Sequence, residues 1–198
     1  MNNKLPDKAK RIDTTNVLTN GRFKVYLHNN IVYKKIILEK YNKFAKTFRE
    51  KMKLDFINYK KIIKIAHKYE WNHTIPAFDI ESNGNYKSVY IAGPRLDKVG
   101  GYLNKIKNKN YAIKMASQIK KAVMKLKKSI NLHSDKITGD WALHNLIYSV
   151  KYDKVFNVDI EGFFTYQKLP DWGQISDINR WLDPVSYTHL TLPTKRIV

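Results

Sequence analysis

The sequence predicts an α+β fold, and two patterns support this class. Short apolar segments separated by turn residues recur along the chain and predict antiparallel strands. A longer stretch has apolar residues at helical spacing, with lysines between them. The chain has 198 residues, of which 43% are hydrophobic and 13% aromatic, so it can bury a core as one domain, or as one domain with two lobes.

The charge and composition of the chain restrict its class. With 37 basic and 17 acidic residues, its net charge of +20 indicates either a solvated lysine-rich surface or affinity for anions such as nucleotides, phosphorylated substrates, anionic lipids or nucleic acid. The absence of cysteine excludes disulfides and thiolate metal sites. No window is apolar over the length of a membrane span, and the N-terminus lacks the apolar run of a signal peptide. We therefore expect a cytoplasmic protein without a transmembrane segment.

The first half of the chain predicts mainly strands. Residues 1–11 are polar, and we expect them to be disordered. Residues 23–28 alternate apolar and polar side chains, Asn29-Asn30 forms a tight turn, and residues 31–37 continue as a second strand, which together predict a hairpin. After it we expect a long helix at residues 39–69 and two strands at residues 75–81 and 87–92.

The second half predicts one clear helix. Residues 97–110 are polar, with Gly100-Gly101 as a break and a short amphipathic piece around Tyr102-Leu103. Residues 111–130 then form an amphipathic helix with lysines on its outer side. Such a basic helix can lie on a membrane surface, but a core helix with a solvated back is the simpler account. Its apolar stripe contains Ile113, Met115, Ala116, Ile119, Ala122, Val123, Leu126 and Ile130.

A second hairpin is predicted after this helix, from strands at residues 146–150 and 155–158 joined by a polar turn. Asp140 and Asn145 precede its first strand, and Asp159 follows its second. Because a tight hairpin brings its two open ends together, we expect these oxygen-bearing side chains at one end of a small sheet. Phosphoryl transfer uses such a set: one carboxylate orients the attacking hydroxyl, while an amide oxygen and a second carboxylate hold Mg²⁺ against the nucleotide phosphates.

The stretch from Leu132 to Gly162 resembles the catalytic and metal-binding segments of the protein-kinase-like superfamily. It reads T-G-D-W-A-L-H-N at residues 138–145 and V-D-I-E-G at residues 158–162. These segments are most similar to the G-D-x-x-x-x-N and D-x-E motifs of the aminoglycoside and choline kinase-like or lipopolysaccharide-core kinase-like branch. The alternative is a surface hairpin whose Asp and Asn residues only form turns.

The resemblance implies a two-lobed protein-kinase-like fold. Its N-lobe, with a small antiparallel sheet, would span residues 12–93, and its mainly helical C-lobe residues 94–183. Residues 184–198 fit neither the composition nor the pattern of the rest of the chain and resemble translated adapter sequence. We therefore expect this tail to be non-native and the C-lobe to be truncated near Asp183.

The resemblance also implies roles for the motif residues. Asp140 would be the catalytic base or orienter for the acceptor hydroxyl, and Asn145 and Asp159 would be the Mg²⁺ ligands. Glu161 would support the metal site or the acceptor. His133 and His144 lie near the motif, but a zinc site would need three imidazoles within reach, so we interpret both as structural.

ATP would be bound by residues of the first half. Lys34, on the face of the small residue Val32, would contact the nucleotide phosphates, with Asp55 as its acidic partner; Lys35 and Glu50 remain alternatives. The backbone from Ile91 to Gly93 would receive the adenine.

The sequence thus predicts a kinase that transfers phosphate from ATP, with Mg²⁺, to a hydroxyl of a small molecule, sugar or lipid headgroup. Protein kinases have arginine at the position of Gly139, lysine at Ala142 and glycine at Glu161, so the motif departs from protein phosphorylation. One alternative is an inactive kinase-like module that binds nucleotide, favoured by the single glycine, Gly21, in the expected phosphate loop. The other is a basic nucleic-acid-binding protein, favoured only by charge, and we expect no specific nucleic acid partner.

Overall fold

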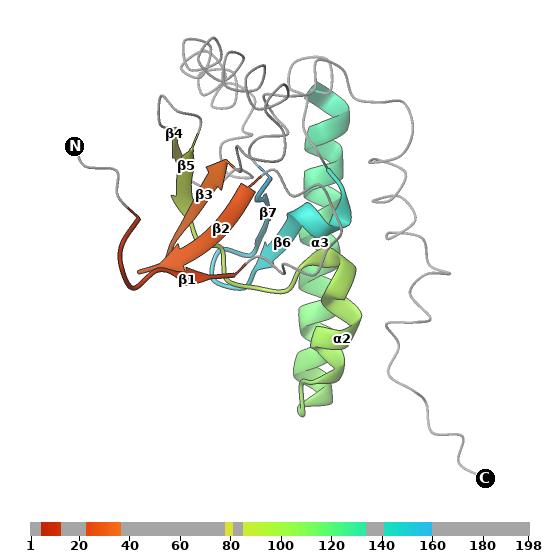
Figure 1. Ribbon diagram of the computed structural model, residues 1–198. Helices are drawn as coiled ribbons and strands as arrows, with labels where there is room; N and C mark the ends of the chain where they lie inside the picture. The colour runs from red at the N-terminus through yellow and green to blue at the C-terminus, as the bar shows by residue number, and fades with distance from the viewer. Residues whose placement is uncertain (1–4, 13–22, 37–77, 81–84, 134–140, 160–198) are drawn as a thin grey trace. The chain divides into compact units, whose positions relative to one another are not determined.

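The computed structural model of the chain describes residues 5–12, 23–36, 78–80, 85–133 and 141–159 (Figure 1). The chain divides into two units, one formed by Met1–Lys64 with Pro76–Tyr90 and the other by Ile65–Ile75 with Ile91–Val198. The long helix predicted between the first and second strand pairs lies outside the described residues.

The first unit contains a five-stranded antiparallel sheet in the order β1-β2-β3-β5-β4. The β2–β3 hairpin confirms the prediction, and Asn29 and Asn30 in its turn have φ angles of 47° and 59°, as a two-residue type I′ turn requires. The short β1 lies within the N-terminal segment that the sequence predicts to be disordered. The strands are β1 Lys10–Arg11, β2 Phe23–His28, β3 Ile31–Ile36, β4 Phe78–Ile80 and β5 Tyr86–Val89.

The strand register gives this sheet two different faces. Directly opposed residues share a face, so Lys34 shares one with Val25 on β2 and Tyr86 on β5. Tyr86 is buried on this face, where the register also places Leu27, Val32 and Ser88. The other face is mainly polar: besides Ile31 and Val89 it carries Lys24, Tyr26, His28, Tyr33, Lys35, Asp79 and Lys87.

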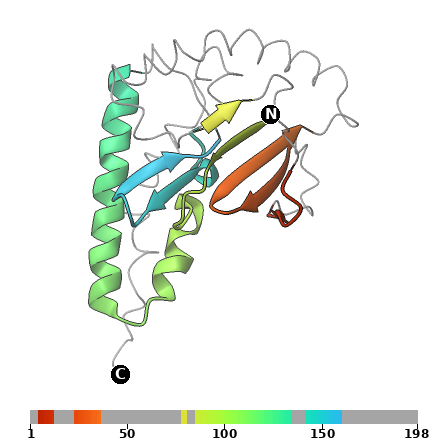
Figure 2. The same cartoon turned by 90° about the vertical axis from the view of Figure 1, so that its left-hand side faces the viewer.

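The second unit packs helices against a two-stranded sheet. The long α3 contacts both β7 and α2, and Figure 2 shows the β6–β7 hairpin and α2 beside this helix. Its core is formed by Leu96, Val99, Leu103, Met115, Ile119, Val123, Trp141, Leu146, Tyr148 and Val155. The elements are η2 Leu96–Lys98, α2 Val99–Asn104, α3 Lys109–His133, η3 Leu143–Asn145, β6 Leu146–Ser149 and β7 Lys154–Asn157.

The helices of this unit confirm part of the prediction and correct the rest. α3 begins earlier than predicted because Asn108 caps it: its Oδ1 accepts a hydrogen bond of 3.0 Å from the backbone N–H of Tyr111. The buried stripe starts at Ala112, whereas Ile113 is 61% exposed, so its assignment to the core was wrong. Gly100-Gly101 does not break the chain but lies inside α2.

A small antiparallel sheet combined with helices confirms the α+β class. Within the described ranges, no helix is both long and apolar enough to cross a membrane.

Candidate functional site

The β6–β7 hairpin forms as predicted, with its turn shifted by one residue towards the N-terminus. Leu146 pairs with Asn157 at one end and Ser149 with Lys154 at the other. Asp153 ends the turn with a φ of 48° and accepts a hydrogen bond of 2.6 Å from the Tyr148 hydroxyl. Burial, together with this hydrogen bond and the charge of Asp153, raises the pKa of Tyr148 above its ordinary range. The turn end of the hairpin is therefore held by its own polar groups.

The opposite, open end brings two predicted site residues together. The backbone N–H of Val158 donates to the carbonyl of Asn145 at 2.9 Å, which extends the strand pairing one step beyond Leu146 and Asn157. Asn145 is anchored from η3, where its own N–H donates to the carbonyl of Ala142 at 2.8 Å. Asp159 directly follows Val158, so Asn145 and Asp159 lie at the same end of the hairpin, as the sequence predicts.

Asn157 is a site residue that the sequence argument misses. Its side chain is fully buried, and its Oδ1 accepts a hydrogen bond of 2.9 Å from the backbone N–H of Asp159. This bond fixes the backbone of Asp159 as the chain leaves β7. The available signal is an asparagine inside the apolar run Val155–Val158, where a buried amide needs specific partners.

The Asn145 amide has unused hydrogen-bonding capacity. The residue is only 9% exposed, and its Nδ2 finds no hydrogen-bond partner within the part of the chain that the structure describes. Leaving a buried polar atom unpaired costs about 1–3 kcal/mol, and such atoms in native proteins usually meet a ligand, an ion or water. Because Nδ2 is a hydrogen-bond donor, it would be satisfied by an acceptor oxygen and not by a cation.

The donor atoms at the open end suit Mg²⁺. This ion prefers hard oxygen ligands and is commonly bound by one or two carboxylates together with substrate phosphates. Asn145 and Asp159 offer an amide oxygen and a carboxylate. Among the described residues there is no group of three His, Cys, Asp or Glu side chains that could hold a metal on its own.

Residues 91–95, named here the crossing segment, lie along β6. The carbonyl of Pro94 accepts a hydrogen bond of 3.0 Å from the N–H of Tyr148, and Arg95 forms a β-bridge with Ile147. Gly93 has a φ of 152°, and a Cβ at this position would overlap the carbonyl oxygen of Tyr148. A glycine is therefore required here by packing, whatever the segment binds, and Ile91 is buried beside it.

An ion pair joins Arg95, the last residue of the crossing segment, to Asp97 in η2, which contacts η3. Arg95 Nε and Nη2 donate to Asp97 Oδ1 at 2.9 Å and Oδ2 at 2.6 Å. Partial burial raises the pKa of Asp97. The hydrogen bonds and charge of Arg95, together with the charges of Lys98 and His144, lower it by more, so the pKa lies below its ordinary value. Asp97 thus stays ionised close to His144, the residue that precedes Asn145.

In the first unit, Lys34 and Lys35 lie on opposite faces of the sheet and have different surroundings. Lys34 Nζ lies 5.2 Å from the centroid of the buried Tyr86 ring, a cation–π distance. Lys35 lies on the polar face, directly opposite Lys24. A lysine on the buried side of a sheet needs a specific partner far more than one beside another lysine on the polar side.

Four predicted residues, Asp140, Glu161, Asp55 and Glu50, lie outside the described residues. The described residues begin again at Trp141, directly after Asp140, and the Trp141 side chain is fully buried.

No model of a known protein family matches the chain, and no curated protein matches its sequence.

Proposed function

We propose that this chain is a two-lobed, protein-kinase-like phosphotransferase that uses ATP and Mg²⁺ to phosphorylate a hydroxyl of a small molecule, sugar or lipid headgroup. The observation that carries the proposal is the open end of the β6–β7 hairpin. There a buried asparagine amide and an aspartate lie on adjoining strand ends, with Asn157 bracing the backbone of Asp159.

The proposed roles follow from the chemistry of the side chains. The amide oxygen of Asn145 and the carboxylate of Asp159 would hold Mg²⁺, which when bound neutralises charge on the nucleotide phosphates. The carboxylate of Asp140 would orient the acceptor hydroxyl and accept its proton. Because phosphoryl transfer needs little covalent assistance from the protein, positioning and charge stabilisation would provide most of the rate enhancement.

The first unit supports the proposal through Lys34. In protein kinases, a lysine on the third strand contacts the nucleotide phosphates. Lys34 lies on the face that contains the buried Tyr86 and Ser88, whereas Lys35 lies on the opposite face, so Lys34 is the candidate that we propose for this contact. The proposed branch, the aminoglycoside, choline or lipopolysaccharide-core kinases, depends on the sequence resemblance alone.

The test is the thermal stability of the protein with ATP, with and without Mg²⁺. A ligand at a hundred times its Kd stabilises a protein by about 2.7 kcal/mol, so we expect a clear rise in melting temperature that requires Mg²⁺. Asp159→Asn keeps the size of the side chain but removes its charge, and we expect it to abolish the Mg²⁺-dependent part. Asp7→Asn, which removes the same charge at an exposed position, should respond like the wild type.

A wild-type protein that shows no Mg²⁺-dependent shift with ATP, or an Asp159→Asn variant that keeps the shift, would contradict the proposal. Turnover is measured separately, as ADP released in the presence of a panel of hydroxyl acceptors. Mg²⁺-dependent binding without turnover on any acceptor would identify an inactive nucleotide-binding module instead.

A further inference from the structure

The surface of α3 that faces away from the core is strongly basic. Seven of the 25 residues of α3 are lysine, and none is acidic. The buried stripe of the helix, from Ala112 to Leu126, fixes which side points outwards. We name the exposed side the outer face of α3; it contains Ile113, Lys114, Ser117, Lys121, Met124, Lys125 and Lys128.

Two large apolar side chains interrupt the lysines of the outer face. Ile113 is 61% exposed and Met124 is 53% exposed. They are separated by three helical turns, so they lie nearly on one line along the helix. Lys114 and Lys125 directly follow them in the chain, so each exposed apolar residue of the outer face has a lysine beside it in the sequence. A helix face that only needs to be solvated gains nothing from exposing these two side chains.

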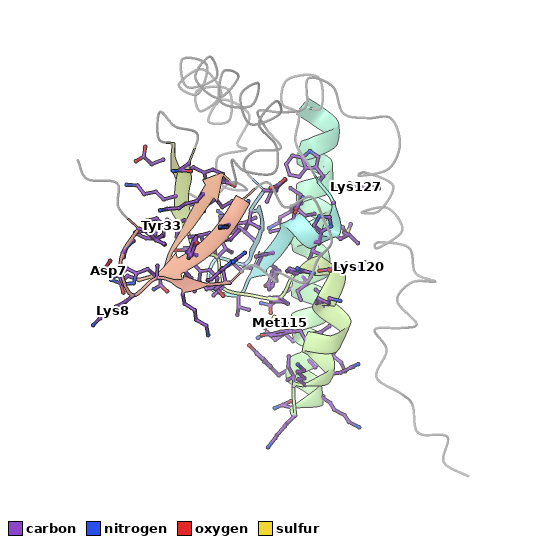
Figure 3. All side chains as sticks on the ribbon, viewed as in Figure 1. Asp7, Lys8, Tyr33, Met115, Lys120 and Lys127 are labelled. Atoms are coloured by element: carbon purple, nitrogen blue, oxygen red, sulfur yellow. The ribbon has the colours of Figure 1, made fainter. Side chains whose placement is uncertain are left out.

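The outer face extends over most of the helix. Figure 3 labels Lys120 and Lys127, two half-buried lysines that are two turns apart on α3 and border one side of the outer face. With about 1.5 Å per residue, α3 is about 37 Å long. Long lysine side chains can place their charges at a polar boundary while their methylenes stay on apolar surface. The combination suits a flat, anionic boundary with an apolar layer beneath it.

We propose that the outer face of α3 binds an anionic lipid surface, with the helix lying in the plane of the membrane. The lysines would contact lipid phosphates, and Ile113 and Met124 would enter the boundary between headgroups and acyl chains. Nucleic acid shares the anionic charge but offers no apolar layer to these two side chains. The face also contains no arginine, the residue that most often makes specific base contacts.

This proposal stands independently of the phosphotransferase activity. If both hold, α3 would keep the protein at the surface where lipid headgroups are presented as acceptors.

The test is co-sedimentation of the full chain with vesicles. We expect it to bind phosphatidylcholine vesicles that contain phosphatidylglycerol, and to bind vesicles of phosphatidylcholine alone much more weakly. Each lysine near an anionic surface contributes roughly a fivefold gain in partitioning, so the triple substitution Lys121→Gln, Lys125→Gln and Lys128→Gln should weaken it about a hundredfold. The matched control, Lys8→Gln with Lys151→Gln and Lys154→Gln, removes the same charge from other exposed positions and should cost far less.

A second variant separates a lipid surface from nucleic acid. Ile113→Ser with Met124→Ser should weaken vesicle binding roughly tenfold but leave binding to generic duplex DNA or RNA unchanged. The proposal is overturned if the two lysine triples lose equal affinity, or if the apolar pair has no effect on vesicle binding. All of these positions are exposed, and a melting curve for each variant verifies that it folds.

Discussion

The β2–β3 and β6–β7 hairpins both carry candidate site residues, but they differ in how far their polar side chains are buried. β2–β3 divides into an apolar face with one lysine and a polar face, and its described side chains are at most half-buried. β6–β7 buries polar side chains as well, since Ser149, Asn145 and Asn157 are all hidden from solvent. A short alternating pattern therefore suffices for the first hairpin, whereas the second also depends on how its buried polar side chains are placed, as in the hydrogen bond that Asn157 accepts from the backbone of Asp159.

The two hairpins also differ in what supports them from outside. The crossing segment lies along β6 and makes a close approach at Gly93, so the second hairpin depends on residues far away in the sequence. The turn of the first hairpin depends only on the local conformation of Asn29 and Asn30.

The largest effect is expected at the contact between the crossing segment and β6. Gly93→Ala would place a Cβ on the Tyr148 carbonyl and require a φ that alanine rarely adopts, so it should destabilise the fold by more than about 3 kcal/mol. Gly101→Ala is the matched control: its Cβ would meet no atom within 4 Å, and alanine in a helix should stabilise by about 0.5–1 kcal/mol. Urea unfolding measures both, and similar stabilities would refute the role of Gly93.

The two ends of β6–β7 should respond differently to the loss of a hydrogen bond. Asn157→Ala should cost about 1–3 kcal/mol and also weaken the Mg²⁺-dependent effect of ATP, because it frees the backbone of Asp159. Tyr148→Phe, at the turn end, should cost about 0.5–1.5 kcal/mol and leave that effect intact. If Asn157→Ala changed stability alone, the bracing of Asp159 would be structural and not part of a site.

Substitutions on the two faces of β3 refine the comparison within the first hairpin. Lys34→Gln should weaken Mg²⁺-dependent binding of ATP by a factor of roughly ten to a hundred, as expected for the loss of a charged hydrogen bond. Lys35→Gln removes the same charge from the adjacent residue and should leave binding almost unchanged. Isothermal titration with ATP and Mg²⁺ measures both constants. Equal losses would mean that only the net charge matters.

The smallest effect is expected at Asp97. Its pKa is lower in the folded protein, so its contribution to stability is present above its ordinary pKa of about 4 and is lost as the pH falls through the folded value. Because Arg95 and Asp97 are partly exposed, Asp97→Asn should cost only about 0.2–1 kcal/mol at neutral pH. Unfolding curves of both proteins should converge in acid, and a difference that grows there would contradict this sign.

Much of the site can be predicted from the chain because its signals are local. The Asn29-Asn30 turn, the alternation of β2 and β3 and the apolar stripe of α3 each depend on neighbouring residues. The pairing of Asn145 with the end of β7 follows from one short hairpin. That Lys34 and Lys35 lie on opposite faces follows from alternation alone, and the register of β5 places Lys34 opposite Tyr86.

Other features were decided only by tertiary structure. Gly93 and Tyr148 are far apart in the sequence, so no local pattern reveals why a glycine is needed. The burial of Asn157 and the exposure of Ile113 depend on what packs against β7 and α3. The sequence by itself determined the β2–β3 and β6–β7 hairpins and the long helix α3, because hydrophobic period and turn chemistry act over a few residues. Which polar groups are buried, and which apolar ones are exposed, was decided by contacts between distant segments.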